Sequence, residues 1–100
     1  MDEVLLTSEL KGGRLRIAAG GSWTAAHARE LEDLVDRVSA DAAAVDNVSI
    51  DMKGVREFDT FGAWLLERLT RAWSAAGRKP EIVGLPPHDR GLLKEMRRVN

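Results

Sequence analysis

The sequence contains no cysteine, and only three prolines and two histidines, in 100 residues. The absence of cysteine excludes disulfide bonds and every metal site built on thiolates. The histidines, His27 and His88, lie far apart, and no His-x-x-x-His pair is present. The usual zinc motifs are therefore missing, and we expect neither a metal nor another cofactor.

The sequence also lacks a long apolar run and a strong excess of charge. No stretch approaches the roughly 20 apolar residues that cross a bilayer. The acidic start Met-Asp-Glu is unlike a secretory signal. Fifteen basic and 16 acidic residues leave a formal net charge of -1, which does not support nucleic-acid binding. We expect a cytoplasmic protein without a nucleic-acid partner.

The overall composition of the chain is sufficient for a hydrophobic core. Apolar residues form 44% of the chain and charged residues 31%, which argues against disorder. A chain of this length suffices for one domain and not for two. We therefore expect residues 1–100 to form a single domain.

Apolar periodicity predicts the elements of this domain. Strict alternation indicates two strands, over residues 4–10 and 14–19, joined by a Gly-Gly turn. In the first strand, Val4, Leu6 and Leu10 share the parity expected to be buried. The segment 20–22 is expected to end the second strand, and Thr24 is expected to be the N-cap of the first helix.

The second half of the chain alternates strands with helices. We expect a loop or frayed helix end over residues 40–47, then a strand over 48–52. A helix should begin at Asp59 and end at Gly77, because glycine adopts the left-handed C-terminal conformation at little cost. A short strand at 82–83 and a last amphipathic helix over 92–99 complete the order β-β-α-β-α-β-α. This order predicts an α/β domain with a mixed β-sheet packed with α-helices.

The helix that begins at Asp59 has the composition of a protein contact surface. At about 100° per residue, Trp64 points away from the core. Thr60, Glu67 and Arg71 share its outer stripe, and Phe61 and Arg68 flank it. Tryptophan and arginine often anchor interfaces. We expect a partner-binding surface formed by Arg56, Asp59, Thr60, Phe61, Trp64, Arg68 and Arg71.

Simpler roles compete with this interpretation. Asp59 is well placed to cap its helix, Thr60 to be an ordinary first-turn residue and Trp64 to cover a neighbouring loop. Trp23 is expected at the sheet edge and Trp73 in the core. The basic last helix, with Arg90, Lys94, Arg97 and Arg98, is either a solvated face or a surface directed toward anionic lipid headgroups.

The segments SIDMKGV at 49–55 and FDTFG at 58–62 resemble the signature of STAS domains, which include the anti-sigma-factor antagonists and domains attached to transporters. That family places an Asp-Ser/Thr-x-Gly motif between its third strand and second helix. The segments GSWT at 21–24 and DTFGAWLL at 59–66 are similar to the STAS domains of Mla-type lipid ABC transporters. The resemblance covers the chain from about residue 15 to residue 99.

The resemblance implies a non-catalytic domain at the cytoplasmic face of the inner membrane. In that branch the domain is a separate subunit or the N-terminal part of a longer permease, and it binds the transporter's ATPase. The alternative is an anti-sigma-factor antagonist, switched when a kinase-type anti-sigma factor phosphorylates Thr60. Threonine at 60 and at 24 departs from the serine and aspartate that are usual in that branch. An enzyme is the third class, but Ser22 and Ser74 lie in no nucleophile motif.

Overall fold

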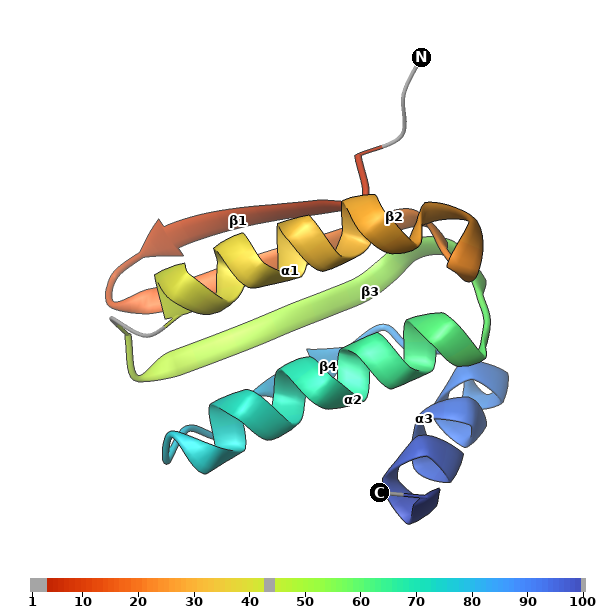
Figure 1. Cartoon of the computed structure of the whole chain (residues 1–100). Helices are drawn as coiled ribbons and strands as arrows, with labels where there is room; N and C mark the ends of the chain where they lie inside the picture. The colour runs from red at the N-terminus through yellow and green to blue at the C-terminus, as the bar shows by residue number, and fades with distance from the viewer. Residues whose placement is uncertain (1–3, 43–44, 100) are drawn as a thin grey trace.

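The computed structural model describes residues 4–42 and 45–99, with the elements labelled in Figure 1. In chain order these are β1 (Leu6–Lys11), β2 (Arg14–Trp23), the short 3-10 helix η1 (Ala25–His27), α1 (Ala28–Ala42), β3 (Asn47–Phe58), α2 (Thr60–Ala75), β4 (Glu81–Val83) and α3 (Pro87–Val99). Apart from η1, this is the predicted order, and the predicted α/β fold class is confirmed.

The four strands form one mixed sheet in the order β1-β2-β3-β4. β1 pairs antiparallel with β2, whereas β2–β3 and β3–β4 pair parallel. Ile17 pairs with Ile50, which pairs with Ile82, so one apolar row crosses the parallel part of the sheet. β1 and β4 are the two edges, whereas the central strand β2 carries Gly20 and Gly21 and the central strand β3 leads into Asp59 at the start of α2.

Helices α1 and α2 cover one face of the sheet, and α3 packs against α2 (Figure 1). Side chains of β2 alternate accordingly: Leu15 and Ile17 are buried, whereas Arg14, Arg16 and Ala18 are exposed. Among the described residues no helix lies on the second face of the sheet. The domain therefore has two layers, and its core lies between the sheet and the helices.

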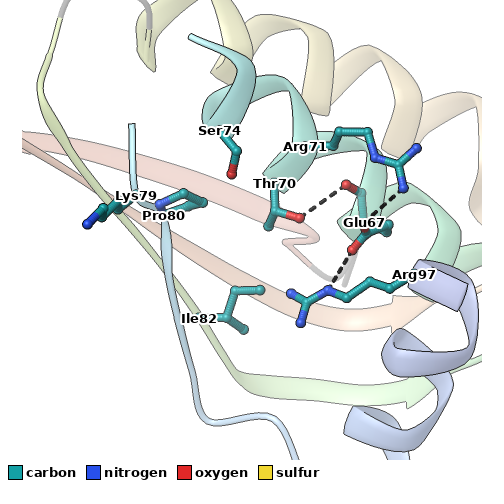
Figure 2. A pocket seen from close by; sticks show the side chains of 8 residues that line it. All are labelled: Glu67, Thr70, Arg71, Ser74, Lys79, Pro80, Ile82 and Arg97. Carbon is teal, nitrogen blue, oxygen red and sulfur yellow. Dashed lines mark hydrogen bonds and ion pairs between the residues drawn. The ribbon is translucent and has the colours of Figure 1, made fainter. Parts of the chain in front are cut away.

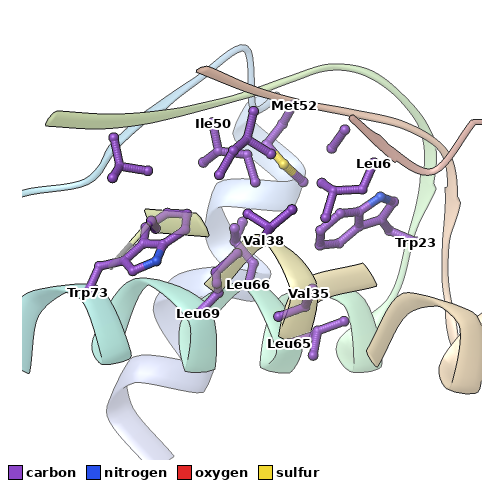
Figure 3. Close-up of a cluster of buried hydrophobic side chains, with 14 of the residues drawn as sticks. Leu6, Trp23, Val35, Val38, Ile50, Met52, Leu65, Leu66, Leu69 and Trp73 are labelled. Atoms are coloured by element: carbon purple, nitrogen blue, oxygen red, sulfur yellow. The ribbon is translucent and has the colours of Figure 1, made fainter. Parts of the chain in front are cut away.

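Two tryptophans lie at opposite ends of the core (Figure 3). Trp73 is 3% exposed, which confirms its predicted core position. Trp23 is fully buried, and its Nε1 donates a hydrogen bond to the carbonyl oxygen of Leu5 at 3.0 Å. The prediction of a sheet-edge position for Trp23 was wrong, because β2 is a central strand and its last residue turns into the core.

The central strands are longer than the sequence pattern predicted. β2 continues through the glycines at 20 and 21 to Trp23, and β3 continues to Phe58. Two register shifts between β2 and β3 accommodate this segment, where glycine marks a bulge. A Cβ at Gly20 would lie 2.9 Å from the carbonyl oxygen of Val4, so glycine permits a close backbone approach. The last helix likewise begins earlier than predicted, at Pro87.

The predicted burial of the first strand was only partly correct. Leu6 is buried, but Val4 is 63% exposed and Leu10 is 64% exposed. β1 begins at Leu6, after Val4, and Leu10 lies at its hairpin end beside a hollow near the C-terminus of α1. Alternation fixes which side chains share a face, but burial also requires a helix above that part of the strand.

Candidate functional site

The carboxylate of Asp59 joins the beginnings of two helices. Its Oδ1 accepts a hydrogen bond from the amide of Gly62 at 3.0 Å, which is the predicted N-cap of α2. Its Oδ2 accepts from the amide of Ala25 at 3.1 Å, in the turn that leads into α1. Because both helix N-termini carry partial positive charge, one carboxylate stabilises both.

Thr24 does not cap the first helix, contrary to the prediction. Its side chain makes no capping hydrogen bond, and its Oγ1 lies 3.0 Å from the Oγ of Ser22. Asp59 supplies the missing acceptor from a segment 34 residues away. The sequence around Thr24 carries no signal for this arrangement, because the two segments meet only in the folded chain.

Gly62 permits α2 to approach the end of β2 closely. A Cβ at this position would lie 2.1 Å from the carbonyl oxygen of Trp23 and 3.1 Å from a ring carbon of Phe58. Any side chain here would therefore push α2 away from the sheet. Asp59 and Gly62 hold the start of the helix in place, and Thr60, its first residue, is exposed there.

Three side chains of α2 stack along its exposed side. The rings of Phe61 and Trp64 lie 5.8 Å apart, and the guanidinium of Arg68 lies 5.2 Å from the centroid of Trp64. Phe61 is half-buried against the core, whereas Trp64 is 36% exposed. Arg68 also forms an ion pair with Asp36 of α1 at 3.6 Å. These contacts already restrict the rotamers of the three side chains, so less conformational entropy would be lost if a partner bound there.

Glu67 is buried, although the helix wheel placed it on the outer stripe. It lies between Arg71, at 3.3 Å, and Arg97 of α3, at 2.9 Å (Figure 2). The Glu67 side chain is only 8% exposed. Glu67 does lie on the same side of α2 as Thr60 and Trp64, but α3 packs over this part of the helix. The exposed part of α2 is consequently narrower than expected.

The predicted partner-binding residues thus divide into groups. Thr60, Phe61, Trp64 and Arg68 follow one another along the exposed side of α2, and we call them the Thr60 surface. Asp59 lies at its end, engaged with two amides. Arg71 is tied to Glu67 and lines a different hollow, and Arg56 is exposed near the end of β3. Sequence reasoning missed Asp36, because no local pattern shows that α1 lies beside Arg68.

The described residues offer no constellation for metal binding. They contain no group of three histidine, cysteine, aspartate or glutamate side chains arranged to hold a metal ion. Within the same ranges, no helix is both long and apolar enough to cross a membrane. The most distinctive arrangement is the anchored start of α2 with its exposed hydroxyl and aromatic side chains.

A comparison with protein families matches most of the chain. A family model described as "Mlab, STAS domain" matches residues 6–98. The chain belongs to the STAS domain family. STAS domains are generally non-catalytic modules with regulatory or docking roles. In this STAS domain, Asp59 and Gly62 of the Asp-Thr-x-Gly motif serve the fold, whereas the side chain of Thr60 is exposed.

Similar solved structures support the fold of this STAS domain. A structure described as "Crystal Structure Analysis of Mglu" has a TM-score of 0.65 and 19% identity, covering 77% of this chain and 19% of the other. A second, of Mglu in its native form in 4.3M NaCl, has a TM-score of 0.52 and 23% identity, covering 86% and 26%. This chain thus spans only about a fifth to a quarter of the length of those chains, and the likeness shows the fold alone. The comparison with curated proteins gave no match.

Proposed function

We propose that this STAS domain is a regulatory docking component of a Mla-type lipid ABC transporter, at the cytoplasmic face of the inner membrane. Its partner is the ATPase subunit, next to the permease. The observation that carries the proposal is the exposed Thr60 on a helix start that Asp59 anchors through two amides. The description of the matching family model, "Mlab, STAS domain", supports the choice of the Mla-type branch.

The Thr60 surface has the properties of an interface anchor. Trp64 offers a partly exposed indole whose position is limited by Phe61 and Arg68. The adjacent Thr60 hydroxyl forms no hydrogen bond within the described residues, so it is available to donate or accept across an interface. Docking regulates an ATPase only if the domain binds one of its conformational states more tightly than another.

Substitutions on the Thr60 surface test the proposed contact. Thr60→Ala and Trp64→Ala should each weaken binding to the ATPase subunit, the tryptophan variant by about tenfold or more, because buried interface tryptophans are typical hot spots. The measurement is affinity purification of the tagged chain from mildly solubilised source cells, followed by titration of the purified ATPase. Lys11→Ala, in β1 at the opposite edge of the sheet from β4, is the matched control.

The possible results test the contact surface and the identity of the partner separately. Loss of binding in both variants, with unchanged melting temperature and an unaffected Lys11→Ala, supports the proposal. Binding of the ATPase by both variants at wild-type affinity shows that the Thr60 surface is not the contact. Failure to recover any ABC ATPase with the wild-type chain overturns the transporter assignment itself.

An anti-sigma-factor antagonist is the second candidate, because the same exposed hydroxyl is accessible to a kinase. A phosphate at Thr60 would sit at the N-terminus of α2, where the helix dipole favours negative charge. It would also lie beside the carboxylate of Asp59. Mass spectrometry of the Thr60 peptide and recovery of a kinase-type anti-sigma factor test this candidate, and an unmodified Thr60 together with a bound ATPase argues against it.

A further inference from the structure

Two adjoining hollows lie between the edge strand β4 and helices α2 and α3, away from the Thr60 surface. Their volumes are about 440 Å³ and 590 Å³, and they share Pro80, Ile82 and Arg97. Leu85 and Leu93 extend the apolar part of the second hollow. We call the pair the β4 groove; Figure 2 shows its first hollow, with Ile82 and Pro80 facing Glu67 and Arg97.

Cations line the whole length of this groove. Arg71 and Lys79 lie in the first hollow, Arg90 and Lys94 in the second, and Arg97 in both. The STAS domain as a whole has a formal net charge of -1, so this concentration of positive charge is local. Such a concentration attracts negatively charged partners and accelerates their association.

Among the described residues that line the groove, the one carboxylate is already engaged. Glu67 accepts hydrogen bonds from Arg71 and Arg97, and it is almost completely buried. Arg90 donates a hydrogen bond from its Nε to the carbonyl oxygen of Leu85 at 2.9 Å, so three of the five cations are held in place by an internal partner. Lys79 and Lys94 are exposed and form no ion pair with other residues in the ranges that the structure describes. Their charge is available to a ligand.

We propose that the β4 groove binds an acidic segment of a partner protein, one that also carries apolar side chains. The apolar residues of the segment would contact Pro80 and Ile82, which are half-buried, above Leu85 and Leu93, which are each 5% exposed, while its carboxylates pair with the surrounding cations. The cations are distributed along two hollows instead of converging on one point, which matches several carboxylates along a chain better than one phosphate group. The groove is a second docking site, independent of the Thr60 surface.

The test uses a fluorescein-labelled peptide of eight residues, Glu-Leu-Glu-Glu-Leu-Glu-Glu-Leu, and fluorescence anisotropy at low salt. We expect the wild-type chain to bind this peptide. The double variant Lys79→Glu/Lys94→Glu should bind about tenfold more weakly or worse, because each reversal replaces an attraction by a repulsion. A peptide with lysine in place of glutamate, and one with serine in place of leucine, should bind much more weakly.

The matched control is Lys11→Glu/Arg14→Glu, which changes the net charge equally at the β1–β2 hairpin, where these two residues pair and where neither lines the groove. This control should leave peptide affinity within about twofold of wild type, since exposed distant charges are screened by salt. Amide chemical shifts should change around residues 79–85 and 90–97, and Thr60→Ala should not alter binding.

Three results would overturn the proposal. One is an equal loss of peptide binding in both double variants, which would reflect net charge alone. Another is absence of peptide binding to a wild-type chain that binds phosphatidylglycerol vesicles, which would make the groove a lipid contact. The third is displacement of the peptide by millimolar inorganic phosphate at constant ionic strength, which would indicate a simple anion site.

Discussion

At the scale of single residues, the Asp-Thr-x-Gly motif combines two structural positions with one exposed one. Asp59 was predicted as a helix cap, and that role is confirmed by its bond to the amide of Gly62. The sequence could not reveal the second bond, to Ala25, because it depends on where the first helix begins in space. The need for glycine at 62 was equally hidden, since the nearest atom belongs to Trp23, 39 positions earlier in the sequence.

The glycine of the motif gives a direct prediction. Gly62→Ala should lower the free energy of unfolding by about 3 kcal/mol, because the new methyl group would overlap a backbone carbonyl. Gly91→Ala is the matched control: it lies inside α3 with nothing near its Cβ position. That change should stabilise by about 0.5–1 kcal/mol through helix propensity. Urea denaturation of both variants checks the pair, and equal effects would contradict the close approach of α2.

At the scale of elements, periodicity located the helices, but it could not show what covers them. Residue spacing in α2 correctly aligned Glu67 with the outer stripe of Thr60 and Trp64. The packing of α3 then buries Glu67 and leaves Trp64 partly exposed. A helix wheel describes α2 alone, whereas burial also depends on α3, the helix that packs against it. The predicted exposed side of α2 was therefore too wide.

The contact between α2 and α3 supplies a further prediction. Arg97→Ala removes one of the two cations on a buried carboxylate, and should lower the free energy of unfolding by about 1–2 kcal/mol. The value is modest because Arg97 itself is 54% exposed. Arg98→Ala, which removes an exposed pair with Glu95, should change stability by less than about 0.5 kcal/mol.

Thermal and urea unfolding of the two arginine variants provide the measurement. Amide exchange across α3 should accelerate in Arg97→Ala and not in Arg98→Ala, because only the first loosens the helix from α2. Equal stability of the two variants would show that Glu67 is compensated by Arg71 alone.

At the scale of the whole molecule, the order of elements and the fold class were predictable from apolar periodicity. The strand lengths were not, because glycines that usually end strands here lie in a bulged pairing between β2 and β3. The exposure of Val4 and Leu10 was also missed, since alternation cannot show that β1 begins only at Leu6 or how far α1 extends over its hairpin end. The sequence predicted a contact surface of seven residues, of which four lie together as the Thr60 surface, while the β4 groove exists only after α3 packs beside α2.

The shared carboxylate of Asp59 has a consequence for how the molecule opens. The amides of Ala25 and Gly62 hydrogen-bond to the same side chain, although they belong to segments far apart in the chain. When this side chain rotates away, both amides lose their acceptor in one event. Their deuterium uptake should therefore follow a common opening rate, and Asp59→Ala should raise both rates together. This end of the domain then behaves as one cooperative unit instead of two fraying helix ends.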